Sequence, residues 1–326
     1  MLRRGARGAL GALGGRGSRV AAVLALAVVL APAGCGAGGD ADPVRVGFSQ
    51  LSAEGSWRAA NTASIRSALT PADGFELTFS DDQRKQEGQI AVLRGFIAAD
   101  VDVIAFSPVV QDGWDQVLRE ARDAGVPVVL VDRSTTSRLD GAYVTRVGAD
   151  FRAEGERAGR WVREHAPGAR VFELQGTLGS GAQVARQQGF RAVVGDQVVG
   201  EATGAFTRAG GRDVTAAALE AWPEVDLVFA HNDDMALGAV EAVRAAGLRP
   251  GVDVRVVSVD GTREALRALA DGEIAHVVEC DPLFGEQLAA VLRRVAAGER
   301  VPDRVVVPGR GFDRSVTEAE IEARTY

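Results

Sequence analysis

The sequence predicts an α/β protein with two doubly wound parallel sheets, and three observations support this fold class. Short valine-rich apolar runs alternate with amphipathic stretches from Val44 to the end of the chain. Some ten runs of this kind suggest two sheets rather than one. The chain has 326 residues, a length that suits two domains of ordinary size better than one compact core.

Each strand candidate is an almost continuous apolar run, which is typical of parallel strands buried on both faces. The candidates are residues 44–49, 75–80, 101–106, 126–131, 142–147, 169–174, 197–202, 226–230, 254–259 and 275–279. Helical patterns lie between them, for example over residues 88–99, 114–124, 154–163, 184–194 and 235–246. Alternation repeated this often predicts right-handed βαβ units. The break between the sheets is expected near Gly148-Ala149-Asp150, where no proline- or serine-rich linker stands, so we expect a hinge of a few residues.

The first 35 residues differ from the rest and have the order of an export signal. Five arginines without an acid precede an unbroken apolar run over residues 20–30, and small residues then lead to Cys35. The run is shorter than the roughly 20 residues of a transmembrane helix. Gly34-Cys35 resembles a lipoprotein cleavage box, so Cys35 is the expected lipidation site and residues 36–42 the expected tether. Pro32 departs from the usual box, and cleavage without lipidation remains an alternative.

Charge and cysteine usage exclude several classes of function. Without the five arginines of the signal, the formal net charge of −7 becomes −12, and an acidic surface argues against nucleic-acid binding. Lipidation of Cys35 would leave Cys280 without a partner, so we expect no intramolecular disulfide. The three histidines are scattered, and no Cys/His spacing typical of a metal site occurs, so we expect neither a metal nor a cofactor.

Ligands of open parallel sheets bind beyond the carboxyl ends of the strands, so the residues that follow each strand candidate are the candidates for ligand binding. After the first strand come Glu54, Trp57 and Arg58. An indole packs against the C–H face of a sugar, and charged groups bind its hydroxyls. Trp57 could equally anchor the first helix in the core.

Further polar residues follow later strands. Asp132-Arg133 follows the fourth strand and fits either a ligand site or a strand-end salt bridge. In the second half, Arg186 follows a glycine-rich loop that lacks the Lys-Ser/Thr of a nucleotide-binding loop. Candidate cleft residues there are also Asn232, Asp260 and Glu279, with helix capping as the alternative for Asn232.

Ten segments, taken in order, carry a family resemblance. They are residues 46–50 (VGFSQ), 57–60, 86–90, 107–114, 130–134, 173–177, 186–190, 205–214, 230–243 (AHNDDMALGAVEAV) and 258–262. With them the chain resembles the type I periplasmic sugar-binding proteins of ABC importers, and most of all the galactofuranose binders. Gly55-Ser56 stands in the reverse order from the family motif, and Cys280 replaces a small polar residue.

The resemblance implies two Rossmann-like lobes joined by a three-segment hinge. The first lobe would hold residues 43–149 plus 280–304, and the second 150–279 plus 305–326. Matching positions place nine residues around the sugar: Glu54, Trp57, Arg58, Asp132, Arg133, Arg186, Asn232, Asp260 and Glu279.

The implied function is delivery of a monosaccharide, galactofuranose above all, to a membrane permease with a separate ATPase. The protein would be a monomer without catalytic residues, exported and anchored on the outer face of the cytoplasmic membrane, or periplasmic without lipid. Another aldose (ribose, arabinose, xylose or galactopyranose) is the alternative ligand. Asp132 and Asp260 could in principle serve a secreted glycosidase, a less favoured alternative.

Overall fold

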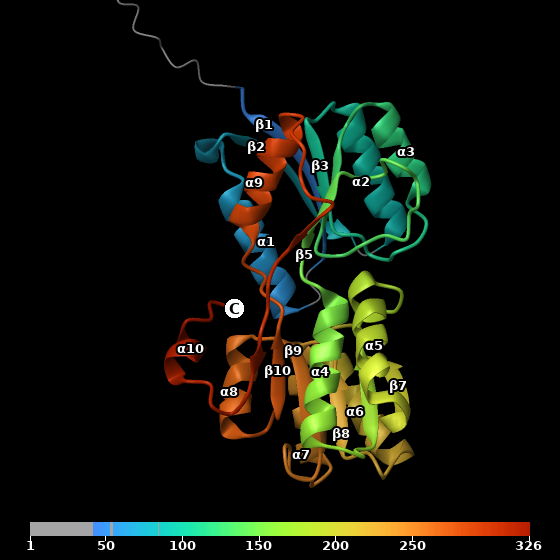
Figure 1. The fold of residues 1–326 in the computed structure, drawn as a ribbon, viewed down its shortest axis with the longest axis vertical. Helices are drawn as coiled ribbons and strands as arrows, with labels where there is room; N and C mark the ends of the chain where they lie inside the picture. Colours follow the sequence, from blue (N-terminus) through green and yellow to red (C-terminus); the bar gives the residue numbers. More distant parts are fainter. Residues whose placement is uncertain (1–41, 53–54, 84) are drawn as a thin grey trace, which may run out of the picture. The chain divides into compact units, whose positions relative to one another are not determined.

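The computed structural model describes residues 42–52, 55–83 and 85–326 of the chain (Figure 1). The expected export signal, Cys35 and Glu54 lie outside the described residues. Among the helices of the described part, none is both long and apolar enough to cross a membrane.

The first sheet has strands in the order β11-β5-β4-β3-β1-β2, all parallel. Their bounds are Val44–Leu51 (β1), Phe75–Gln83 (β2), Val103–Phe106 (β3), Val128–Val131 (β4), Thr145–Gly148 (β5) and Arg304–Val306 (β11). Helices α1 (Ser56–Ala68) and α9 (Gly285–Ala296) cover one face, and α2 (Gln86–Ala98) and α3 (Asp115–Asp123) cover the other, as Figure 1 shows. A short 3₁₀ turn, Pro71–Asp73, precedes β2.

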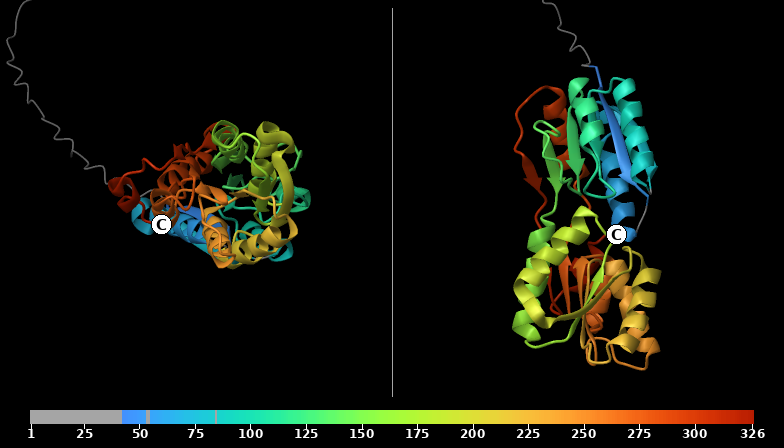
Figure 2. Two further views of the ribbon diagram at one scale, coloured as in Figure 1. Left: turned by 90° about the horizontal axis from the view of Figure 1, so that it is seen from below. Right: turned by 90° about the vertical axis from the view of Figure 1, so that its right-hand side faces the viewer.

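The second sheet has the order β12-β10-β9-β8-β6-β7. Its strands are Val171–Gln175 (β6), Val198–Thr203 (β7), Leu227–Ala230 (β8), Arg255–Asp260 (β9), His276–Glu279 (β10) and Gly311–Phe312 (β12). Helices α4 (Phe151–His165) and α5 (Gly181–Val194) pack together on one face, and α6 (Arg208–Ala221), α7 (Asp233–Ala245) and α8 (Arg263–Asp271) lie on the other (Figure 2). The 3₁₀ turn Gly195–Gln197 follows α5, and α10 (Glu318–Glu322) packs against α8 near the C-terminus.

The predicted fold class is confirmed, and each of the predicted strands is present. The strand expected over residues 142–147 begins later, at Thr145. The elements β11, β12 and α10 were not predicted, because they have only 3, 2 and 5 residues and show no readable period. The examples given from the sequence also did not include α6, α8 and α9. The expectation of parallel strands fails at β12, which pairs with β10 in the antiparallel sense because the chain leaves β11 and enters the second sheet at the edge where β10 ends.

Within the described residues, the chain passes between the two sheets three times: after β5, after β10 and after β11. The crossing segments lie side by side. The Val307 N–H donates to the Gly148 carbonyl at 3.2 Å, and the Glu279 N–H donates to the Arg310 carbonyl at 2.7 Å. The last crossing begins after Val306, the final residue of β11. The exact residues at which each lobe begins and ends stay a prediction.

Helices α4 and α5 approach each other closely at two glycines. A Cβ on Gly155 would lie 2.1 Å from the Arg186 carbonyl oxygen, and one on Gly189 would lie 2.1 Å from the Arg152 carbonyl oxygen. The missing side chains therefore let the two backbones meet. This contact sets the position of α5, the helix that carries Arg186.

We expect Gly155→Ala to lower the free energy of unfolding by about 1–3 kcal/mol, because the added methyl group forces α4 and α5 apart. Gly95→Ala in α2 is the matched control, since its Cβ would meet no atom within 4 Å. Urea denaturation of both variants measures the difference. Equal stability of the two variants would contradict the proposed backbone contact.

His276 on β10 is a buried base whose ring stacks on Trp161, with the ring centroids 5.4 Å apart. Burial lowers the pKa of His276 to about 4. Between pH 6.5 and pH 4 the unfolded chain therefore binds a proton at this site that the folded chain does not bind. The contribution of His276 to stability is complete above pH 6.5 and is lost as the pH falls toward 4.

We expect His276→Leu to weaken this acid sensitivity, because leucine cannot titrate. The free energy of unfolding of the variant, relative to that of the parent, should rise by up to about 3 kcal/mol between pH 7 and pH 4. Denaturation at several pH values measures this trend. His165→Leu, on the exposed side of the same stack, serves as the control and should show a smaller trend. Parallel pH curves for the parent and His276→Leu would contradict the prediction.

Candidate functional site

A cavity lies among the ends of strands from both sheets. Its lining residues come from widely separated segments of the chain: Gly55, Trp57, Arg58, Asp132, Arg133, Phe151, Ala182, Arg186, Phe206, Asn232, Asp260 and Cys280. Seven of the residues predicted from the sequence are among them. They meet here because parallel strands place the loops after their carboxyl ends at one edge of each sheet.

Arg58 and Asp132 form a buried ion pair that belongs to the first sheet. The Arg58 Nη2 donates to Asp132 Oδ2 at 2.5 Å, and both side chains are 5% exposed. Asp132 follows β4 with φ 63°, a left-handed conformation that aspartate tolerates better than most residues. Of the two alternatives raised for Asp132-Arg133, the salt bridge exists, but its arginine is Arg58.

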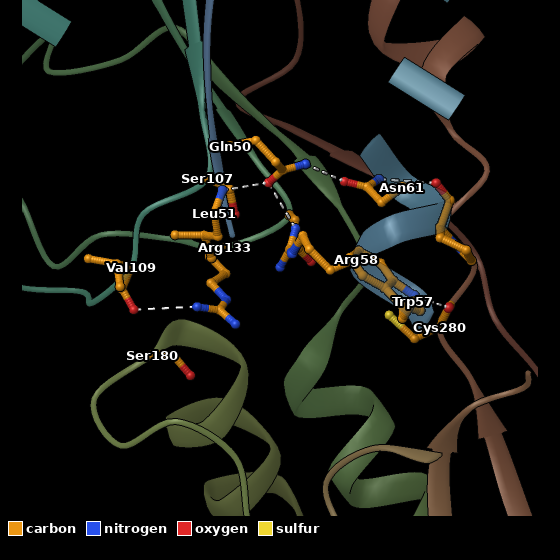
Figure 3. Close-up of polar contacts among 12 residues, drawn as sticks. Gln50, Leu51, Trp57, Arg58, Asn61, Ser107, Val109, Arg133, Ser180 and Cys280 are labelled. Carbon is orange, nitrogen blue, oxygen red and sulfur yellow. Dashed lines mark hydrogen bonds and ion pairs between the residues drawn. The ribbon is translucent and has the colours of Figure 1, made fainter. Parts of the chain in front are cut away.

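Gln50, at the end of β1, fixes the other side of Arg58. Its Oε1 accepts from Arg58 Nη1 at 3.2 Å, and its Nε2 donates to Asn61 Oδ1 at 3.0 Å, as Figure 3 shows. Asn61 in turn donates to the Pro282 carbonyl at 3.0 Å. The Arg58 Nε keeps no hydrogen-bond partner within the described part of the chain. The guanidinium is thus held at two nitrogens, with a third donor left unused.

Trp57 is fixed by the crossing segment that follows β10. Its indole N–H donates to the Cys280 carbonyl at 2.5 Å (Figure 3), and the Arg58 guanidinium lies 4.8 Å from its ring centroid. Trp57 is 8% exposed, so it anchors α1 and also lines the cavity. The structure thus shows the core anchor and places the ring at the cavity, and the contact with a sugar stays a prediction.

Arg186 from α5 and Asp260 from β9 form a second, looser pair. The Arg186 Nε donates to Glu154 Oε2 at 2.9 Å, and its Nη1 donates to the His231 carbonyl at 2.6 Å. Its Nη2 lies 3.9 Å from Asp260 Oδ1, too far for a hydrogen bond. Although burial opposes the charged form, the carboxylates of Glu154 and Asp260 raise the pKa of Arg186 above its ordinary value.

Asp260 is a buried carboxylate with unused hydrogen-bonding capacity. Burial and the neighbouring Asp233 raise the pKa of Asp260 well above its ordinary value, in spite of Arg186. Its Oδ2 has no hydrogen-bond partner among residues 42–52, 55–83 and 85–326. Asp260 therefore offers one acceptor oxygen, beside the Arg186 guanidinium, that no group of the described chain satisfies.

Asn232 caps a helix, as one of the two alternatives predicted, and its place in the lining leaves binding of a ligand a prediction. Its Oδ1 accepts from the Met235 N–H at 3.1 Å and caps α7, and its Nδ2 donates to the Phe206 carbonyl at 3.2 Å. The residue also lines the cavity. Next to it, Asp233 accepts from the N–H groups of Gly261 and Thr262 at 2.8 and 2.7 Å, and it thereby holds the loop after β9.

Aromatic rings supply the apolar part of the lining. The Arg133 guanidinium lies 5.4 Å from the Phe206 ring centroid, and the Arg186 guanidinium lies 5.1 Å from that of Phe151. The candidate list from the sequence omitted Phe151 and Phe206. Phe206 lies in a loop with φ 62°, and Phe151 begins α4 beside the first crossing segment. Position after a strand, the signal used for the polar residues, does not distinguish such rings from core residues.

Glu279 was expected in the cleft but is not among the lining residues. Its Oε1 forms an ion pair with Arg324 Nη2 at 2.5 Å, and its Oε2 accepts from the Arg310 N–H at 3.2 Å. The side chain instead ties the C-terminal tail to two crossing segments. The neighbouring residue, Cys280, lines the cavity with a buried free thiol.

The arrangement suits a small neutral ligand with several hydroxyl groups. The cavity wall carries two Arg–Asp pairs, one from each sheet, together with an asparagine and aromatic faces. Hydroxyl groups both donate and accept, so they can satisfy mixed donors and acceptors, whereas the C–H faces of a sugar ring pack on aromatic surfaces.

Comparison with known proteins agrees with this geometry. Residues 46–300 match the periplasmic binding protein domain, and the chain belongs to that family of extracytoplasmic solute-binding proteins. It is 36% identical over 276 residues to the galactofuranose-binding protein YtfQ of Escherichia coli K12, covering 82% of this chain and 86% of that protein.

This chain is also similar to two solved structures. A Mycobacterium smegmatis protein in complex with β-D-fucofuranose is 46% identical, with a TM-score of 0.80 and coverage of 86% of this chain and 93% of its own. The binding component of the arabinose ABC transporter of Shewanella sp. ANA-3, bound to L-arabinofuranose, is 38% identical, with a TM-score of 0.81 and coverage of 86% and 95%.

We expect Asp132→Asn to lower the free energy of unfolding by about 3–5 kcal/mol, because it leaves the Arg58 charge buried without its partner. Asparagine tolerates the left-handed backbone at this position, so the backbone conformation itself should be unaffected. The double variant Arg58→Met/Asp132→Asn should recover much of the loss. Chemical denaturation of Asp132→Asn, Arg58→Met and the double variant gives the coupling energy. Additive effects of the two substitutions would contradict the pairing.

Proposed function

We propose that this protein binds one monosaccharide in its furanose form, galactofuranose in the first place, and delivers it to a membrane permease driven by a separate ATPase. The observation that carries the proposal is the pair of Arg–Asp units, Arg58–Asp132 and Arg186–Asp260, which line one cavity from two different sheets. Only a ligand with hydroxyl groups on opposite sides uses both. The ring form and the sugar follow from the relatives named above, whose ligands are furanoses.

The proposed binding mechanism has two steps. The sugar first contacts the first lobe, where Trp57, Arg58 and Asp132 are already held in place. Closure about the three crossing segments then brings Arg186, Asn232 and Asp260 to the opposite side. Once the sugar is enclosed, an unpaired hydroxyl costs about 1–3 kcal/mol, so each hydroxyl must find a partner. That penalty is the proposed source of selectivity.

A second candidate is a furanose without the terminal hydroxyl of galactofuranose. The M. smegmatis relative was solved with β-D-fucofuranose and the Shewanella relative with L-arabinofuranose. In this chain the apolar side of the cavity includes Phe151, Ala182 and Phe206. A methyl group or a hydrogen atom would fit such a surface better than a hydroxyl group does.

The remaining parts of the proposal concern location and chemistry. Export with lipidation at Cys35 would anchor the protein on the outer face of the cytoplasmic membrane, where a permease can be reached. The proposed function includes no catalytic step, no cofactor and no metal. Acting as a monomer, the protein would release the sugar unchanged.

A thermal-shift panel on residues 43–326 tests this proposal, with galactofuranoside, fucofuranoside, arabinose, ribose, xylose, galactose and ATP as probes. A ligand at ~1,000 times its dissociation constant adds ~4 kcal/mol to stability, which is a readily measured shift. We expect a large shift with one furanose and none with ATP. The absence of a shift with any sugar would overturn the proposed ligand class.

Substitution of two lining residues tests the site itself. Trp57→Ala and Arg186→Ala should each weaken sugar binding by about tenfold or more, because each removes a buried contact with the ligand. Arg212→Ala is the matched control, since Arg212 is 52% exposed and pairs with its neighbour Asp213. Calorimetric titration gives the affinities. Wild-type affinity in both variants would show that the sugar binds elsewhere.

A further inference from the structure

The N-terminus of α1 is completed by a residue from the other sheet. The helix starts after Gly55, which has no side chain, and its first turn contains no acidic residue. The Asp234 Oδ2 accepts from the Ser56 N–H at 2.9 Å and from the Ser56 hydroxyl at 3.1 Å. Asp234 lies in the first turn of α7, which packs on the second sheet. One carboxylate therefore satisfies a free N–H of α1 and places negative charge at the positive end of that helix.

Glycine at position 55 is what permits this contact. A Cβ on Gly55 would lie 2.2 Å from Asp234 Oδ2, closer than any non-bonded contact allows. The next residue, Ser56, adds the hydroxyl donor. The order Gly55-Ser56, noted in the sequence as a departure from the family motif, thus provides both the space and the second hydrogen bond.

Asp234 acts differently from the two residues before it. Asn232 caps its own helix and lines the cavity, and Asp233 holds the loop after β9. Asp234 does not line the cavity, and its hydrogen bonds to Ser56 join parts of the chain 178 residues apart. The two residues after Ser56 are Trp57 and Arg58, both of which line the cavity. The cap is therefore one residue away from the sugar-binding side chains of the first lobe.

We propose that Asp234 is a positioning residue for sugar binding: by capping α1 from the opposite lobe, it fixes the first turn that carries Trp57 and Arg58 relative to the second lobe and keeps the lobes together around the ligand. This inference rests on the proposed function. Because its two ends lie on different lobes, the contact stabilises the closed form and contributes nothing to the open one. Its loss should speed release of the sugar and leave the rate of association nearly unchanged.

The experiment measures sugar association and dissociation by stopped-flow tryptophan fluorescence. We expect Asp234→Ala to release the furanose found in the panel about tenfold faster, the usual effect of losing a hydrogen bond to a charged group. Asp234→Asn, which keeps an acceptor oxygen, should restore much of the loss. The control, Asp213→Ala, removes a carboxylate that is 68% exposed and pairs with its own neighbour, and it should match the parent.

A second variant removes the same contact by a substitution in the first lobe. Gly55→Ala should speed dissociation as Asp234→Ala does, because the new methyl group excludes the carboxylate. The double variant should be no faster than either single variant, since both remove one contact. Additive effects, or dissociation rates equal to that of the parent in both single variants, would overturn the proposal.

Hydrogen exchange of residues 55–60 separates this inference from the proposed function. The sugar-free protein samples the closed form, in which the cap protects the Ser56 amide. In this protein we therefore expect Asp234→Ala to exchange the Ser56 amide faster than the parent and Asp213→Ala do. If the parent binds none of the sugars but exchanges its Ser56 amide more slowly than Asp234→Ala, the proposed ligand is wrong and the cap by Asp234 is supported. If it binds a sugar and all three proteins exchange and release alike, the cap fails and the proposed function stands.

Discussion

Removal of charged groups from water is the constraint on which the rest of this structure depends. Arg58, Asp132, Arg186 and Asp260 are nearly inaccessible to solvent, and such groups persist only when partners replace the lost hydration. Their partners come from several chain segments. Gln50 at the end of β1, Glu154 on α4 and the His231 carbonyl after β8 each contribute one. The requirement to satisfy buried charge thus fixes how the helices stand over both sheets.

Helix α1 illustrates how closely the pieces are connected. It is attached at Cys280 and Pro282 to one crossing segment, at Gln50 to the end of β1, and at Asp234 to the second lobe. Its first turn therefore responds to the position of the second lobe as well as to the first. The first turn of α1, the end of β1, one crossing segment and the second sheet are thus joined in one network of hydrogen bonds.

Much of this could be predicted from the sequence, for an identifiable reason. Buried parallel strands appear in the sequence as valine-rich runs, and the residues that follow them must meet at a sheet edge. The positions of Asp132, Asn232 and Asp260 could therefore be predicted before the structure was known.

Glu279 is a residue for which this rule gives the wrong position. It follows a strand as the others do, but the C-terminal tail supplies Arg324 as its partner, and nothing near Glu279 in the sequence reveals that contact. The sequence analysis did not identify Phe151 and Phe206 as lining residues for a related reason. A single sequence does not distinguish an aromatic residue that lines a pocket from one in the core. Very short strands such as β12 carry no periodic signal.

The placement of the lining residues at strand ends also bears on how such a protein changes over evolutionary time. Most valines of the sheets are buried, whereas the lining residues lie in loops, at strand ends and in the first two turns of helices. Substitutions there can alter the preferred ligand while the apolar interior of both sheets stays unchanged. One scaffold can thus diversify into importers for many solutes by drift at a dozen positions.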